Sequence, residues 1–148
     1  MKNFNRYFIQ KTIIAVGFLL LPFITYAQDA GALPYHENQV EPDQEMSPSG
    51  TATDKFKAVH IISTSLRGVR GANGVVYWVS KDKATLSTYK GAQLLWRADV
   101  AEAFKPDIQQ PQIEKLVFAS NVVFVFVSKR GFTEINRDTG QLGNKVIN

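Results

Sequence analysis

The sequences VVYWVS at residues 75–80 and VVFVFVS at residues 122–128 decide the fold class of this chain. Each is a short run of β-branched and aromatic residues, which favour strands, and each is followed by a charged turn. Neither run alternates apolar with polar residues, so both predict strands that are covered on both faces. A strand covered in this way needs more than one layer, and the sequence therefore predicts a layered, all-β protein.

Similar short apolar runs, separated by charged or glycine-containing turns, continue through the C-terminal part of the chain. Besides the two runs above, strands are expected at residues 58–65, 84–89, 93–97, 113–119, 132–136 and 141–147. One short helix is also expected, because Asp99 followed by Glu102 forms a capping pair before a run that ends at Phe104. Pro106 then limits this helix to one or two turns.

The chain also matches itself at an offset of 48 residues. Residues 73–96 fall on residues 121–144 without a gap, and eight of the 24 positions are identical, which is far above chance. Trp78 falls on Phe126, so an aromatic residue keeps its place in both copies. The alignment predicts two four-stranded antiparallel units, with residues 81–83 and 129–131 as equivalent turns between the second and third strands.

A four-stranded unit with this repeat length has the size of a propeller blade. The second copy, with Asp138-Thr139-Gly140 after an apolar strand and a short turn, resembles a blade of the quinoprotein-like (pyrroloquinoline-quinone-type) β-propeller repeat. Each copy matches half of the motif. The first keeps Trp96 where the family has a tryptophan but has Lys90-Gly91-Ala92 at the turn, and the second has Asn144 in place of the tryptophan.

The resemblance to two degenerate blades implies a fold more than an activity, because that repeat class contains non-enzymatic scaffold and assembly proteins as well as quinone-dependent dehydrogenases. Two blades cannot close a ring, which takes about four or more. The two units are therefore expected to pack as a sandwich or a partial propeller. Assembly of several chains and descent from a longer array are the alternatives to a compact monomeric sandwich.

Residues 1–27 have the features of a cleavable signal peptide. Basic residues precede an uncharged apolar run at residues 12–26, and Thr25-Tyr26-Ala27 suits signal peptidase. A retained anchor is the alternative, but the run is shorter than the roughly 20 residues that span a bilayer and contains Pro22. We therefore expect an exported protein, periplasmic or secreted, with no stable membrane span after cleavage. Its core must form without disulfides, because the chain has no cysteine.

Residues 28–54 contain six acidic residues, three prolines and neither Lys nor Arg, so they predict a disordered acidic linker. Residues 55–148 form the expected β-rich repeat domain and carry an excess of basic residues. The linker is expected to act as a spacer, with the alternative that its carboxylates cover a basic face of the domain.

No catalytic residue, metal site or cofactor is predicted. The two histidines, His36 and His60, show no Ser-His-acid or His-His-carboxylate spacing. His60 stands in an expected strand, where a core or edge histidine is the favoured interpretation, and the carboxylates of the domain are scattered over turns, which disfavours a glycosidase pair. The sequence therefore predicts a protein that is not an enzyme.

Candidate ligand-binding residues come from three features. In the stretch 67–71, RGVRG, glycines would let backbone N–H groups approach an anion between two arginines, with a solvated hairpin loop as the alternative. Lysines and an arginine on the two equivalent turns predict a shared basic edge, with solvated turn charges as the alternative. Tryptophans would stack on sugars if exposed and fill the core otherwise. The candidates are Arg67, Arg70, Trp78, Lys81, Lys83, Trp96, Lys129 and Arg130.

The leading functional expectation is a non-enzymatic protein-interaction or envelope assembly module with an envelope or secreted protein partner. It depends on the blade resemblance and on sheet edges that two units leave exposed. The alternative is a domain that binds a carbohydrate or an anionic envelope ligand such as an anionic polysaccharide, and a hydrolase comes third. Nucleic acid is not an expected partner, because the protein is exported and has few basic residues. A monomer or a small homo-oligomer is expected.

Overall fold

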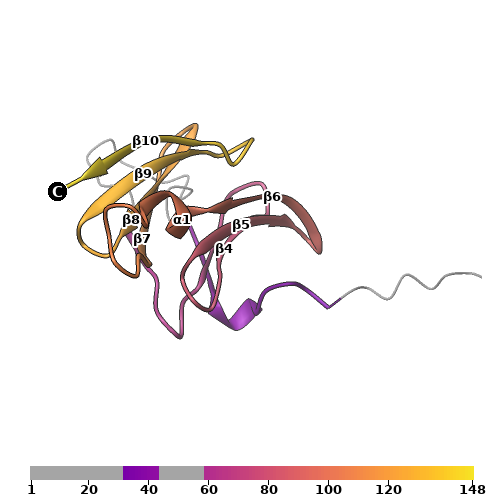
Figure 1. Cartoon of the computed structure of the whole chain (residues 1–148). Helices are drawn as coiled ribbons and strands as arrows, with labels where there is room; N and C mark the ends of the chain where they lie inside the picture. The colour runs from indigo at the N-terminus through magenta and orange to yellow at the C-terminus, as the bar shows by residue number, and fades with distance from the viewer. Residues whose placement is uncertain (1–31, 44–58) are drawn as a thin grey trace, which may run out of the picture.

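The computed structural model describes residues 32–43 and 59–148, and these residues form a two-layered β-structure. Two five-stranded sheets face each other and share one hydrophobic core (Figure 1). The order of strands is β1-β3-β4-β5-β6 in the first sheet and β10-β9-β8-β7-β2 in the second. The all-β, sandwich-like fold predicted from the apolar runs is therefore confirmed.

Each sheet contains a meander of four consecutive antiparallel strands. The first consists of β3 (Gly68–Arg70), β4 (Val75–Val79), β5 (Thr85–Lys90) and β6 (Gln93–Asp99). The second consists of β7 (Ile113–Phe118), β8 (Val122–Val127), β9 (Gly131–Asn136) and β10 (Leu142–Ile147). A fifth strand joins each meander beside its first strand: β1 (Val40–Pro42) is parallel to β3, and β2 (Val59–Ile61) is antiparallel to β7.

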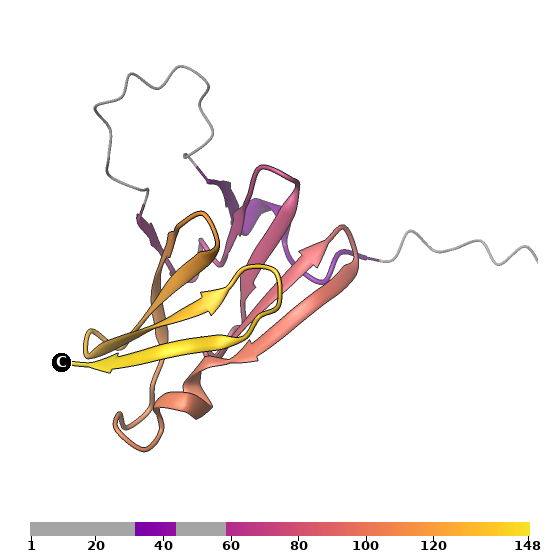
Figure 2. The ribbon, with the colours of Figure 1, turned by 90° about the horizontal axis from the view of Figure 1, so that it is seen from above.

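The predicted short helix is α1 (Val100–Phe104), which connects the two sheets between β6 and β7 (Figure 2). The Asp99 carboxylate accepts a hydrogen bond from the backbone N–H of Glu102 at 3.1 Å, which caps the first turn as expected. Val100, Ala101 and Phe104 are buried, so the helix closes one end of the shared core.

Strand β4 is buried on both faces, as its sequence predicts. Val75, Tyr77 and Val79 belong to the core between the sheets, whereas Val76 and Trp78 belong to a second cluster on the outer side of the first sheet. That second cluster is completed by Tyr35 and Val40, from the segment in indigo and purple in Figure 1. The second layer over β4 is therefore the chain's own N-terminal segment.

The prediction of a disordered linker at residues 28–54 is wrong for residues 32–43, which fold as part of the first sheet. They contain the 3-10 helix η1 (Glu37–Gln39) and β1. The acidic composition did not indicate this folded segment, because its order depends on few residues: the buried Tyr35 and the three residues of β1 that pair with β3. Pro42 is tolerated because β1 is an edge strand, where a missing N–H leaves no partner unsatisfied. The remainder of this segment lies outside the described residues.

Strand β8 differs from its prediction, because it is buried on one face only. Val123, Val125 and Val127 are fully buried in the shared core, while Val122, Phe124 and Phe126 are half-buried on the outer side of the second sheet. The described residues include no segment over this side that corresponds to residues 32–43 over the first sheet.

The strand predicted at residues 58–65 is shorter than expected and belongs to the other sheet. It is β2, which pairs with β7 and not with the first meander. The first strand of that meander is β3, within the stretch that was expected to be a loop. Both strands are three residues long, so neither has enough alternation to specify a partner.

The ungapped alignment of the two units agrees with the structure only as far as the hairpin turn. Val75 and Val79, like the aligned Val123 and Val127, all lie in the shared core. After the turn the two sheets differ, because β4 pairs Val79 with Leu86 whereas β8 pairs Val127 with Gly131. Leu94 is consequently exposed while the aligned Leu142 packs against the core. The common origin of the two units stays a prediction.

The predicted signal peptide, residues 1–27, lies outside the described residues. Within residues 32–43 and 59–148, no helix is both long enough and apolar enough to span a membrane.

Candidate functional site

A pocket of about 280 Å³ lies on the first sheet, where the N-terminal segment, the chain before β3 and the β4–β5 turn meet. Three cationic side chains line it: Arg67, Lys81 and Lys83. The hydroxyl groups of Ser63 and Thr64, the amide of Gln39 and the ring of His36 complete the wall. We call this the cationic pocket. It brings together three of the eight predicted ligand-binding residues.

Arg67 is held in place before any ligand binds. Its Nε and Nη2 atoms donate hydrogen bonds to the carbonyl oxygen of Val79 at 3.1 and 2.8 Å. Its guanidinium lies over the Trp78 ring, 4.5 Å from the centroid, a favourable cation–π geometry. Among the described residues, Nη1 has no hydrogen-bond partner. A fixed guanidinium with a free donor loses little conformational entropy when it binds an anion.

Partial burial lowers the pKa of Arg67 from its ordinary value, and the negative charge of Asp82 opposes this change. The guanidinium nevertheless stays charged, because the ordinary pKa of an arginine side chain is far above neutral pH. The desolvation that lowers this pKa also reduces the screening of an anion bound nearby.

The β4–β5 turn positions the two lysines through Ser80 and Asp82. The Ser80 hydroxyl oxygen accepts hydrogen bonds from the backbone N–H groups of Ala84 and Thr85 at 3.1 and 3.0 Å, and the hydroxyl donates to the Asp82 carboxylate. This hydrogen bond from Ser80 is the main reason that the pKa of Asp82 lies below its ordinary value. The ionised carboxylate therefore fixes the turn from which Lys81 and Lys83 extend.

The other predicted arginine of this region, Arg70, does not line the pocket. Its Nη2 atom donates to a Glu37 carboxylate oxygen at 2.5 Å, and this hydrogen bond raises the pKa of Arg70. Gly68 does not open the backbone to an anion either, because a Cβ atom there would lie 2.8 Å from the Trp78 ring. The glycine makes room for packing. One carboxylate of the acidic segment thus pairs with a basic residue of the domain, and the covering of a whole basic face stays a prediction.

Both tryptophans fill clusters inside the protein and are not available for stacking on sugars. Trp78 lies beneath Tyr35 and His36, with ring centroids 6.1 and 6.2 Å away. Trp96 is buried in the shared core, and its indole Nε1 donates to the Arg137 carbonyl oxygen at 2.8 Å. The alternative interpretation of these residues, that they fill the core, is the correct one.

Lys129 and Arg130 are exposed on the β8–β9 turn and do not line the cationic pocket. This turn and the β4–β5 turn lie beside the same stretch of chain: Ile113 donates its N–H to the Lys83 carbonyl, and Ser128 donates to the Gln112 carbonyl, at 2.8 and 2.9 Å. The two turns are therefore at one end of the molecule, as the predicted basic edge requires, but four cations do not converge on one site.

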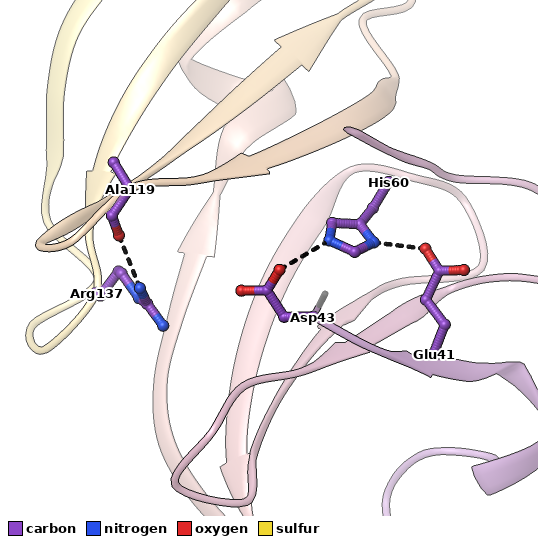
Figure 3. A network of polar contacts seen from close by, with 5 residues as sticks. All are labelled: Glu41, Asp43, His60, Ala119 and Arg137. Carbon is purple, nitrogen blue, oxygen red and sulfur yellow. Dashed lines mark hydrogen bonds and ion pairs between the residues drawn. The ribbon is translucent and has the colours of Figure 1, made fainter. Parts of the chain in front are cut away.

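A second polar cluster ties the two sheets together at His60 (Figure 3). The ring is 2% exposed, with Nδ1 2.5 Å from a Glu41 carboxylate oxygen and Nε2 3.3 Å from an Asp43 oxygen. The carboxylates come from β1 and the residue after it, in the first sheet, and the histidine from β2 in the second. His60 is thus a buried histidine with both nitrogens partnered. The acidic residues were missed because they belong to the segment expected to be disordered.

Arg137, which the sequence did not single out, contacts Ala119 directly after β7 of the second sheet (Figure 3) and Tyr77 on the first sheet. Its Nη1 atom donates to the Ala119 carbonyl oxygen at 2.7 Å and its Nε to the Tyr77 hydroxyl at 3.1 Å. The side chain lines a pocket of about 290 Å³ with Asp138 and Asn73. This pocket combines one cation with the carboxylate of Asp138, so it offers less positive charge to an anionic ligand than the cationic pocket, which has three cations.

In the described parts of the chain, no group of three His, Cys, Asp or Glu side chains has an arrangement that would hold a metal ion. Comparison of the chain with protein-family models, curated proteins and solved structures finds no match. The resemblance to a quinoprotein-like propeller repeat therefore stays a prediction.

Proposed function

We propose that this protein is an exported, non-enzymatic binding module that holds an anionic saccharide, such as a unit of an acidic envelope polysaccharide, in the cationic pocket. The observation that carries this proposal is the convergence of Arg67, Lys81 and Lys83 on one pocket, with Arg67 already fixed by Trp78 and Val79. Among the functions expected from the sequence, this geometry favours the one that was placed second.

The chemistry of the wall supports an acidic sugar over a simple anion. The cations provide charge-assisted hydrogen bonds to a carboxylate or sulfate group. Thr64 adds a hydroxyl group that can exchange hydrogen bonds with sugar hydroxyls, whereas the Ser63 hydroxyl oxygen already accepts from the Leu66 N–H and Gln39 Nε2 already donates to the Thr64 carbonyl oxygen. The volume of about 280 Å³ is at the lower end of ligand pockets, which suits one unit of a longer chain.

The experiment compares two matched double variants in binding to an oligogalacturonate and to neutral dextran. Lys81→Ala with Lys83→Ala removes two cations from the pocket, and Lys129→Ala with Arg130→Ala removes two cations from the turn outside it. Because exposed ion pairs contribute about 0.2–1 kcal/mol each, we expect the loss of two cations to weaken binding of the acidic oligosaccharide about 2- to 30-fold. The turn variant should bind like the unchanged protein.

Salt provides a second readout, since added NaCl screens exposed charges over distances of about 10 Å at 0.1 M. Affinity should therefore fall as the NaCl concentration rises. Equal losses in the two double variants would indicate a general surface charge effect and would refute the pocket as the site. Equal binding of neutral dextran would refute the role of the acidic group.

A protein-interaction role, the function that the sequence placed first, is supported by a different observation. The outer side of the second sheet carries apolar side chains that the described residues leave uncovered.

A further inference from the structure

The outer side of β7, β8, β9 and β10, with the edge strand β2, forms an apolar surface that we call the outer face. Paired residues define two rows across it. One row runs through Ile61, Lys115, Phe126, Phe132 and Val146, and the next through Val59, Val117, Phe124 and Glu134. Seven of these nine side chains are apolar, and Ile61 and Val59 are 64% and 56% exposed.

The aromatic residues of the outer face form a preorganised cluster. The rings of Phe124 and Phe126 lie 6.2 and 5.6 Å from the ring of Phe132. The Lys115 ammonium lies over Phe126, 4.9 Å from its centroid. All three rings are half-buried by their neighbours and retain an accessible side. Covering such a surface with another apolar surface removes it from water and lowers the free energy.

The two sheets differ in how this need is met. On the first sheet, Tyr35 and Val40 cover Trp78 and Val76, so the outward apolar side chains are buried. On the second sheet, the ring contacts of Phe124 and Phe132 within the described residues are with each other and with Phe126, all on the sheet itself. Within residues 32–43 and 59–148, the outward apolar side chains of the second sheet thus stay half-buried or exposed, and a surface of similar size and apolar character would cover them.

The charges on the outer face are arranged to suit a copy of itself. Lys115 lies on β7 in one row, and Glu134 lies on β9 in the neighbouring row, with β8 between them. Strand and residue spacings place them roughly 12 Å apart, diagonally across the aromatic cluster. A two-fold axis in the interface, midway between them, brings each Lys115 opposite Glu134 of the second copy while the aromatic clusters face each other.

The size of the outer face suits a weak dimer. Five strands spaced about 4.8 Å apart, and about six residues rising about 3.4 Å each, give a footprint of roughly 500 Å² per copy. Two copies then bury roughly 1,000 Å², at the lower limit of specific interfaces. We propose that the occupant of the outer face is a second copy of this chain, packed sheet against sheet with Lys115 opposite Glu134.

The test measures the dimer dissociation constant of the exported protein by analytical ultracentrifugation, from about 1 μM to about 1 mM. Lys115→Glu and Glu134→Lys, made separately, each place like charges opposite each other in both symmetric positions. Each should weaken dimerisation at least 10-fold, because like-charge contacts across an interface are strongly unfavourable. Lys90→Glu, a charge reversal at an exposed position on the first sheet, should leave the constant unchanged.

The decisive measurement mixes the two single variants. At positions 115 and 134, the Lys115→Glu chain is acidic at both and the Glu134→Lys chain is basic at both. Opposite charges then face each other across the interface, so the mixture should form a heterodimer as stable as the original dimer. The double variant with both reversals should also dimerise. Circular dichroism and thermal unfolding of each variant show whether it is folded.

Two results would overturn the proposal. One is that the protein stays monomeric over the whole concentration range, whether it is isolated alone or with a different protein bound to the outer face. The other is a dimer whose dissociation constant is unaffected by either single reversal. Neither result bears on the cationic pocket, whose residues lie on the other sheet or beside it.

Discussion

Tyr35→Ala removes the aromatic ring that joins the N-terminal segment to the outer side of the first sheet. Tyr35 is 5% exposed, and its ring lies 6.1 Å from the Trp78 ring and 5.9 Å from the Tyr89 ring. The variant therefore tests whether residues 32–43 belong to the folded unit. Leu33→Ala is the matched control, because Leu33 comes from the same segment and is 41% exposed.

The expected magnitude follows from the buried surface. An aromatic side chain buries about 150–250 Å², which at about 25 cal/mol per Å² corresponds to about 4–6 kcal/mol. This is an upper bound, since the unfolded chain already buries part of that surface. We therefore expect Tyr35→Ala to lower the free energy of unfolding by about 3 kcal/mol, the lower end for aromatic-to-alanine changes. Leu33→Ala should change it by less than about 0.5 kcal/mol.

Urea unfolding followed by tryptophan fluorescence measures both variants, and Trp78, beside Tyr35, provides a local probe. A loss of 3 kcal/mol corresponds to a fall in Tm of about 12 °C or more for a domain of this size. If Tyr35→Ala and Leu33→Ala gave the same small change, residues 32–43 would not contribute to stability. Residues 32–43 would then behave as the disordered linker that their composition predicts, and the packing of Tyr35 in the second cluster would be refuted.

Three further predictions concern individual contacts. His60→Ala should lower the free energy of unfolding by about 3 kcal/mol, measured in urea, because it leaves a buried carboxylate without its partner; a change below about 1 kcal/mol would show that the contact is unimportant. Gly140→Ala should cost clearly more than Gly74→Ala in thermal unfolding: both glycines have positive φ, but a Cβ at Gly140 would lie 2.6 Å from the Trp96 ring whereas Gly74 faces open space, and equal losses would contradict this packing. Because its folded pKa is lowered, Asp82 contributes stability that is present above its ordinary pKa of 3.8 and is lost as the pH falls through the folded value; Ser80→Ala should raise the Asp82 pKa in an NMR titration, and an unchanged value would refute Ser80 as its main cause.

Much of the fold could be predicted from local patterns. Apart from β3, the strands of both meanders were expected within a few residues, because they are short apolar runs, most of them rich in β-branched or aromatic residues, bounded by turns. The cap of α1 was also expected, since it depends on Asp99 and Glu102, three positions apart. These features involve neighbours in the chain, so the sequence carries their full signal.

The candidate site was predicted in part. Arg67, Lys81 and Lys83 were singled out for their charge, and they do line one pocket. His36 and Gln39 were not, because a composition rich in acidic residues and proline hid a segment that folds through one aromatic ring and one short strand. Trp78 was a candidate for stacking on a sugar, with the core as the favoured location, and it is buried beneath Tyr35 of the segment that was expected to be disordered.

The sequence by itself determined that this protein is built from short antiparallel strands, because alternation, turn residues and helix caps act over a few residues. The tertiary structure alone decided that β2 joins the second sheet, that β1 joins the first, and that β4 is covered on both faces while β8 is not. The reason is that a strand of three residues has too few side chains for its own sequence to specify its partner strand. The partner is selected by contacts such as Tyr35 with Trp78 and His60 with Asp43, which form only after distant segments meet.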